Sequence, residues 1–91
     1  MQFAYDPKKS AANRTKHGIS LEEAQQLWSV PAVELKARTV GEERWMIIGL
    51  LHGKCHSCIF TMRADVIRLI SARRSHLNEE RLYHDTIQTS R

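Results

Sequence analysis

The sequence lacks the features of an exported, disulfide-linked or membrane-embedded protein. Only two of its 91 residues are cysteine, and no basic-then-apolar leader follows Met1. We therefore expect neither export nor a structural disulfide. The longest apolar run, residues 45–51, is far too short to cross a bilayer. These absences favour a cytoplasmic protein that does not enter a membrane.

The two cysteines occur in the order H-G-K-C-H-S-C, and they give only weak support to a metal site. His52, Cys55, His56 and Cys58 could in principle ligate zinc. A single C-x-x-C without a second pair of ligands is a poor zinc signal, however. The simpler interpretation is that these residues decorate the tip of a hairpin between two strands. We expect no metal and no other cofactor.

Acidic residues are too few to balance the basic ones. Ten Asp and Glu stand against 14 Lys and Arg, which gives a net charge of +4. This moderate excess is compatible with binding to nucleic acid or to an acidic protein. A hydrophobic content of 42% indicates a folded chain with one small core. We therefore expect residues 1–91 to form a single domain.

Two N-terminal helices are indicated by their capping residues. Asp6 and Pro7 predict the start of a helix that runs to about His17, and Gly18 is placed to end it. A second helix begins after residue 20, where S-L-E-E matches a capping box, and Pro31 ends it.

After the second helix, most of the chain shows the alternating or continuous apolar pattern of strands, and a final helix follows. Extended segments are predicted over residues 2–5, 32–38, 44–51, 58–63 and 63–74. The short loops between the later strands favour antiparallel pairing. Ser75 is expected to cap the last helix. The predicted fold is α+β, with an antiparallel sheet of about four strands packed against two N-terminal helices and a C-terminal helix.

The segment R-A-D-V-I-R-L-I-S-A-R-R, residues 63–74, is the most distinctive part of the sequence. Strict alternation along a strand predicts two faces. One face would carry Ile67, Leu69, Ser71 and Arg73, and the other Val66, Arg68, Ile70, Ala72 and Arg74. Guanidinium groups match phosphate oxygens with two parallel hydrogen bonds, so a rigid strand of this kind could hold phosphate. Alternatively, these arginines are solvated charges with buried stems.

Several segments together resemble a known family. They are D-P-K-K-S-A-A-N-R-T-K-H-G-I-S-L-E-E-A, G-E-E-R-W-M-I-I-G, T-M-R-A-D-V-I-R-L-I-S-A-R-R and E-R-L-Y. In this order they resemble the BrnT family of bacterial type II toxins. The resemblance implies a fold like that of the RelE ribonuclease toxins and an RNA-cleaving activity. It also implies a cognate BrnA-like antitoxin, a ribbon-helix-helix protein encoded beside the toxin.

In that family the antitoxin carries the DNA-binding element, and the toxin–antitoxin complex represses its own operon. The resemblance therefore implies a hetero-oligomer that contacts operator DNA only through the antitoxin. It also implies that the toxin, when free, inhibits translation and growth.

Metal-independent RNA cleavage requires a base near the 2′-hydroxyl, cations around the phosphorus and a proton donor to the leaving 5′-oxygen. Arg63, Arg68 and Arg73 are the candidate cations, and they could converge on one phosphate if the strand register allows it. Ser71 could hydrogen-bond a phosphate oxygen. Lys16 and Arg74 are candidate RNA contacts.

Two further candidates have equally plausible structural roles. His17, in the family's K-H-G motif, could be the base of the reaction, or it could simply be a cation at a helix C-terminus. Tyr83 could stack on a base or donate a proton, or it could be a core tyrosine. The same basic sheet could also belong to a module that binds nucleic acid or protein without cleaving anything.

Overall fold

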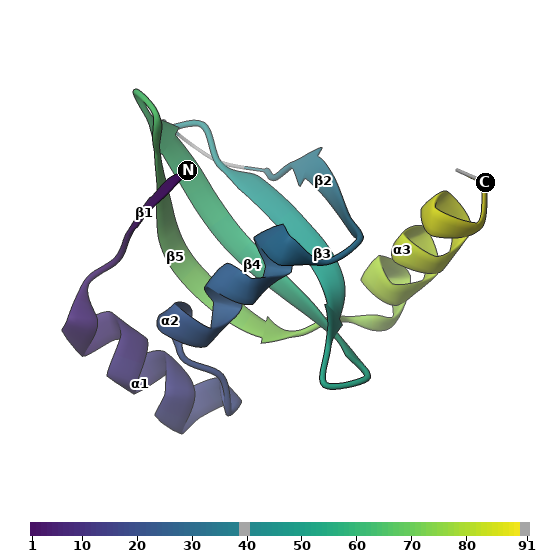
Figure 1. Cartoon of the computed structure of the whole chain (residues 1–91), viewed down its shortest axis with the longest axis horizontal. Helices are drawn as coiled ribbons and strands as arrows, with labels where there is room; N and C mark the ends of the chain where they lie inside the picture. The colour runs from purple at the N-terminus through teal and green to yellow at the C-terminus, as the bar shows by residue number, and fades with distance from the viewer. Residues whose placement is uncertain (39–40, 90–91) are drawn as a thin grey trace.

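The computed structural model describes residues 1–38 and 41–89, and within these residues three α-helices pack on a five-stranded sheet (Figure 1). The elements are β1 (Gln2–Ala4), α1 (Pro7–His17), α2 (Leu21–Ala24), the 3-10 helix η1 (Gln25–Ser29), β2 (Ala32–Lys36), β3 (Trp45–Leu51), β4 (Lys54–Arg63), β5 (Val66–Arg74) and α3 (Leu77–Thr89).

The sheet has the strand order β1-β5-β4-β3-β2. The predicted α+β class is confirmed, and the pairings among β2, β3, β4 and β5 are antiparallel as expected. The described sheet has five strands rather than about four. The predicted first strand is β1, and it makes the sheet mixed rather than fully antiparallel, because it pairs in parallel with the first part of β5, from Gln2 opposite Val66 to Ala4 opposite Arg68. Parallel pairing is possible here because the whole helical region and three strands separate β1 from β5 along the chain.

The predicted caps of the N-terminal helices are confirmed. Asp6 Oδ1 accepts a hydrogen bond from Lys8 N at 2.8 Å, and Gly18 ends α1 in the left-handed conformation with φ of 77°. Ser20 and Glu23 form the expected capping box at the start of α2. The second helix is shorter than expected as an α-helix, since it continues from Gln25 as the 3-10 helix η1.

Two apolar clusters lie on opposite faces of the sheet. The main core lies between the sheet and the α2–η1 segment, which passes in front of the strands in Figure 1, whereas α1 lies beside the sheet. Leu27 on η1 is fully buried, and it reaches the sheet at Gly49, where an added Cβ would lie only 3.1 Å from Leu27 Cδ2. The second cluster joins α3 to β3 and β4 through Tyr83, Ile48 and Cys55.

The start of α3 differs by one residue from the prediction. The helix begins at Leu77, so His76 rather than Ser75 precedes its first turn. The backbone N–H of His76 donates to Glu79 Oε1 at 2.9 Å, and Glu79 is therefore the side chain that closes this helix end.

Asn13 joins α1 to the edge of β5 that β1 leaves uncovered. Its side-chain nitrogen donates to Ala72 O at 2.8 Å and to Ile19 O at 2.7 Å. Its side-chain oxygen accepts from Ala72 N at 3.2 Å. The amide thus satisfies both outward backbone groups of Ala72, as a neighbouring strand would. Asn13 is itself buried, so it fixes the position of α1 beside this edge.

We predict that Asn13→Ala will destabilise the protein by about 3 kcal/mol, because it leaves three buried backbone groups without partners. Urea unfolding followed by tryptophan fluorescence measures the change. Thr15→Ala is the matched control on the same helix, since the Thr15 hydroxyl is exposed and only donates to Ala11 O within its own helix. An equal loss of stability in the two variants would contradict the role assigned to Asn13.

Candidate active site

A β-bulge in β5 decides which side chains share a face of the sheet. Ile59 pairs with Ser71, but the next residue of β4, Phe60, pairs with Leu69, so Ile70 has no partner in β4. Residues paired directly across two strands point to the same side. Leu69 and Ala72 therefore both face the main core, although they are three positions apart and strict alternation would place them on opposite faces.

The bulge also places Arg68, Ser71 and Arg73 together on the opposite face. Their partners in β4 are Thr61, Ile59 and Ser57, which alternate with the core residues of that strand. Strict alternation had put Arg68 on the other side from Ser71 and Arg73. That prediction is wrong because one extra residue reverses the alternation partway along the strand.

Three of the candidate residues meet where α1 ends beside the bulge. A pocket of ≈210 Å³ is lined by Lys9, Ala12, Asn13, Lys16, His17, Ile70 and Ser71. The helical residues share one side of α1 because of their spacing. His17 and Ser71 are half-buried, whereas Lys16 is exposed. The pocket thus combines an imidazole, an ammonium group and a hydroxyl on two elements that Asn13 holds together.

Arg68 lies on β5 between this pocket and the β4–β5 turn. Its side chain is half-buried and makes no hydrogen bond or ion pair with any residue in the described ranges, 1–38 and 41–89. Its guanidinium group is therefore available to an anion on the open part of the sheet.

Arg73 forms an ion pair with Glu79 of the same chain. Its Nη1 and Nη2 donate to Glu79 Oε1 and Oε2 at 2.8 and 2.9 Å. Glu79 Oε1 also accepts from Ser57 Oγ at 2.9 Å, and the Ser57 and Ser75 hydroxyl oxygens lie 2.7 Å apart. The sequence favours a helix N-terminal role for Glu79, but it gives no sign that this carboxylate would occupy Arg73.

Arg63 lies at the far end of the β4–β5 hairpin. It pairs with Val66, whereas Arg73 pairs with Ser57. The distance from position 57 to position 63 along β4 is about 20 Å, so Arg63 and Arg73 cannot contact the same phosphate. Arg63 Nη2 instead binds Glu42 Oε1 at 3.0 Å. The hypothesis that Arg63, Arg68 and Arg73 converge on one phosphate is therefore wrong.

The last two candidates lie elsewhere. Tyr83 is 5% exposed and packs with Ile48 and Cys55 under α3, so its ring cannot stack on an RNA base in this conformation. Arg74 is exposed at the end of β5, where its register partner is His56. Its partner is on the core side of the sheet, so Arg74 does not share the face of Arg68.

Comparison with known families decides the class of the protein. The family described as "Ribonuclease toxin, BrnT, of type II toxin-antitoxin system" matches residues 5–79. The chain belongs to the BrnT family. It is a ribonuclease toxin of a type II toxin–antitoxin system, and the family implies an RNA substrate and a cognate antitoxin. The match includes every candidate site residue except Tyr83. No match was found among curated proteins.

The cysteines of this BrnT-family toxin do not lie at a hairpin tip, as the sequence suggested. The turn is formed by His52 and Gly53, and Cys55 and Cys58 are already within β4. Both are buried, Cys58 in the main core and Cys55 in the cluster beneath α3. They therefore point to opposite faces of the sheet and cannot ligate the same zinc ion. Burial raises the pKa of the Cys58 thiol to about 12.

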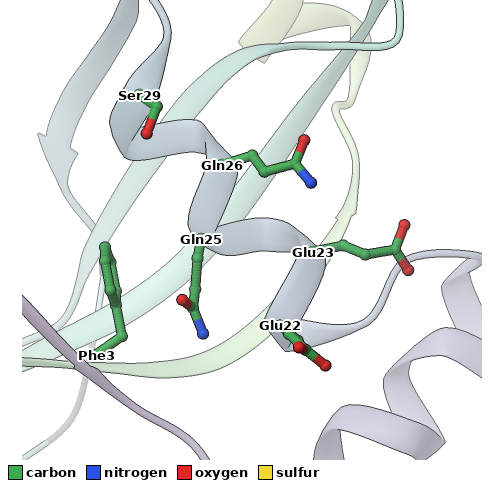
Figure 2. A pocket seen from close by; sticks show the side chains of 6 residues that line it. All are labelled: Phe3, Glu22, Glu23, Gln25, Gln26 and Ser29. Atoms are coloured by element: carbon green, nitrogen blue, oxygen red, sulfur yellow. The ribbon is translucent and has the colours of Figure 1, made fainter.

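A second hollow is unsuited to RNA because its charges have the wrong sign. It has a volume of ≈460 Å³ and lies where α2 and η1 pass β1. Figure 2 shows its lining side chains, Phe3, Glu22, Glu23, Gln25, Gln26 and Ser29. Two carboxylates without a lining cation would repel phosphate. The basic groove beside α1 is therefore the better candidate for RNA. Among the described residues, no helix is long and apolar enough to cross a membrane.

The carboxylate of Glu79 makes stability depend on pH. Burial alone would raise the pKa of Glu79, but hydrogen bonds from Arg73, the His76 backbone and Ser57 outweigh burial and lower it to about 2. A lowered folded-state pKa stabilises the protein above the unfolded value of 4.5, and this contribution is lost as the pH falls towards 2.

We predict that Glu79→Gln will destabilise the toxin at neutral pH by on the order of 3 kcal/mol. The difference from the unaltered protein should shrink as the pH falls from about 5 towards 2, because the unaltered protein then loses the same carboxylate. Urea unfolding at a series of pH values measures this. Glu22→Gln, at an exposed position, should leave both stability and its pH dependence nearly unchanged; a constant difference for Glu79→Gln at all pH values would contradict the assignment.

Proposed function

We propose that this toxin cleaves RNA without a metal ion, by attack of the neighbouring 2′-hydroxyl on phosphorus in the groove between the end of α1 and the bulge of β5. The observation that carries the proposal is the shared pocket of Lys16, His17 and Ser71. Because of the bulge, Arg68 follows on the same sheet face as Ser71. An RNA strand lying along this face would meet a base, a hydroxyl donor and cations in succession.

The groove contains a group for each requirement of the reaction. His17 accepts the proton of the attacking 2′-hydroxyl. Ser71 donates a hydrogen bond to a phosphate oxygen, and Arg68 stabilises the charge that develops on phosphorus. The leaving 5′-oxygen needs a proton in exchange, and we assign its donation to Lys16, which lines the same pocket as His17.

The remaining candidates lie outside the reaction centre in this proposal. Arg73 positions the end of β5 and the start of α3 through Glu79 rather than binding RNA. Arg74 points to the other face of the sheet and takes no part in the groove. Arg63 and Tyr83 take no part in the reaction, because one is paired at the far end of the hairpin and the other is in the core.

We further propose that the partner is a BrnA-like ribbon-helix-helix antitoxin, that it forms a hetero-oligomer with the toxin, and that the complex represses its own operon through the antitoxin. An antitoxin that covers Lys16 and Arg68 would exclude RNA from the groove. A ribbon-helix-helix protein encoded in the adjacent reading frame would support this partner, and an unrelated fold there would oppose it.

We predict that His17→Ala will reduce RNA cleavage by about 10²- to 10⁴-fold and Arg68→Ala by about 10²-fold, because they remove the base and a transition-state cation. Cleavage of a defined RNA by the purified toxin measures the rates, and filter binding measures RNA affinity. His17→Ala should lower affinity far less than rate, which separates catalysis from simple binding.

The matched control is Arg63→Ala, the same substitution at the far end of the same hairpin, which should change the rate by no more than about twofold. If Arg63→Ala abolished cleavage while His17→Ala did not, the reaction centre would have to be moved towards the β4–β5 turn.

Cleavage should persist in the presence of EDTA, because every step is assigned to a side chain and to the 2′-hydroxyl of RNA. The products should carry 2′,3′-cyclic phosphate ends, which mass spectrometry detects. Cleavage that stops with EDTA and returns with added Mg²⁺ would overturn the proposed mechanism while leaving the ribonuclease assignment intact.

A further inference from the structure

Among the described strands, β2 pairs only with β3, so its other edge is free. The backbone N–H of Ala37 donates to Arg44 O at 2.9 Å, which sets the hydrogen-bonding phase of this strand pair. Because bonded pairs alternate in an antiparallel ladder, the N–H and C=O groups of Ala32, Glu34 and Lys36 point away from β3. These outward groups make no hydrogen bond within residues 1–38 and 41–89. They are available to a further strand.

Two hollows lie on the sheet face covered by η1: the smaller one is beside this edge, and the larger, apolar one extends across the sheet as far as β5. One, of ≈280 Å³, is lined by Leu27, Trp28, Val30, Ala32, Glu34 and Ile47. The other, of ≈350 Å³, is lined by Met1, Trp28, Glu34, Trp45, Phe60, Met62 and Ile67. Trp28 and Glu34 belong to both, so they form the boundary between the hollows.

The boundary between the hollows consists of an aromatic ring, Trp28, which packs against two other rings, and a carboxylate, Glu34. The Trp28 ring makes edge-to-face contacts with Phe3 and Phe60, at centroid distances of 5.2 and 5.0 Å. Glu34 is exposed, and it is the one charged side chain among the described residues that line the two hollows. It has no ion pair there, whereas neighbouring Lys36 is paired with Glu43 at 2.6 Å.

These features favour an extended, cationic protein segment and disfavour RNA. A free strand edge offers main-chain hydrogen bonds to another extended chain, and a hollow beside it can admit one of its side chains. An unpaired carboxylate at the edge attracts a Lys or Arg and repels phosphate. A family toxin has a cognate antitoxin as its protein partner.

We infer that an extended segment of the cognate antitoxin adds to the free edge of β2, with a Lys or Arg opposite Glu34. Same-face residues of a strand recur every second position, about 7 Å apart. The residue of the segment opposite Ala32, two positions from this cation, therefore lies beside the smaller hollow. This inference rests on the proposed toxin–antitoxin function, but the surface is separate from the groove of His17 and Ser71, so an antitoxin can hold the toxin here and cover the groove with another part.

The first test measures the affinity of the purified cognate antitoxin for toxin variants by calorimetry. Glu34→Lys should weaken binding at least about tenfold, because it sets like charges against each other. Glu22→Lys, the same reversal at an exposed glutamate that lines the hollow in Figure 2 and not the β2 edge, should change affinity by no more than about twofold. Changing the matching Lys or Arg of the antitoxin to Glu should restore binding to Glu34→Lys.

RNA cleavage by Glu34→Lys should stay at the level of the unaltered toxin, which shows that the variant is folded. Loss of cleavage in the unaltered toxin would count against the proposed mechanism but not against this interface, since affinity is read separately. Equal affinity of Glu34→Lys and Glu22→Lys for the antitoxin would overturn the inference.

The second test needs no variant. Backbone amide exchange of the unaltered toxin, followed by NMR, should slow at Ala32, Glu34 and Lys36 when the antitoxin is added. Protection confined to α1 and β5 would mean that the antitoxin binds only over the RNA groove, and it would overturn the inference. Protection of β2 that rises with toxin concentration alone would identify a second copy of the chain as the occupant, and it would overturn it as well.

Discussion

A single unpaired residue, Ile70, determines the surface chemistry of this toxin. Without the bulge, the alternation that buries Ile67 and Leu69 would also direct Ser71 into the main core and Ala72 out of it. A hydroxyl would then be buried where the structure has a small apolar side chain. The bulge keeps both halves of β5 in register with the core and at the same time gathers Arg68 and Ser71 on one open face.

The bulge contributes to the pocket only because the adjacent edge of β5 forms its hydrogen bonds with a side chain instead of with another strand. β1 pairs with β5 no further than Arg68. Beyond that point Asn13 satisfies the outward backbone groups of Ala72, and it brings the last turn of α1 against Ser71. A longer β1 would satisfy the same groups, but it would occupy the space in which Lys16 and His17 form the pocket.

The sequence predicted the features that local chemistry controls. Asp6, Gly18 and the Ser20–Glu23 box mark helix ends by hydrogen bonds within a few residues, and all are present. It could not predict features set by distant partners. The bulge depends on how β4 and β5 pack on a shared core, and the Arg73–Glu79 pair depends on where α3 lies relative to β5. Cys55 and Cys58 lie within β4 because the turn before this strand is shorter than the polar segment from His52 to Ser57 suggested.

The distribution of charge gives the two sides of the molecule different partners. The protein is basic overall, yet the free edge of β2 has an acid, Glu34, without an ion pair among the described residues. The groove at Lys16 and Arg68 attracts any polyanion, and such attraction is weakened by salt and selects poorly. The β2 edge instead offers main-chain hydrogen bonds in a fixed register beside one carboxylate, and pairing of this kind is directional. The groove lies beside β5 and the free edge belongs to β2, at the other side of the sheet, so a change at one surface need not alter the other.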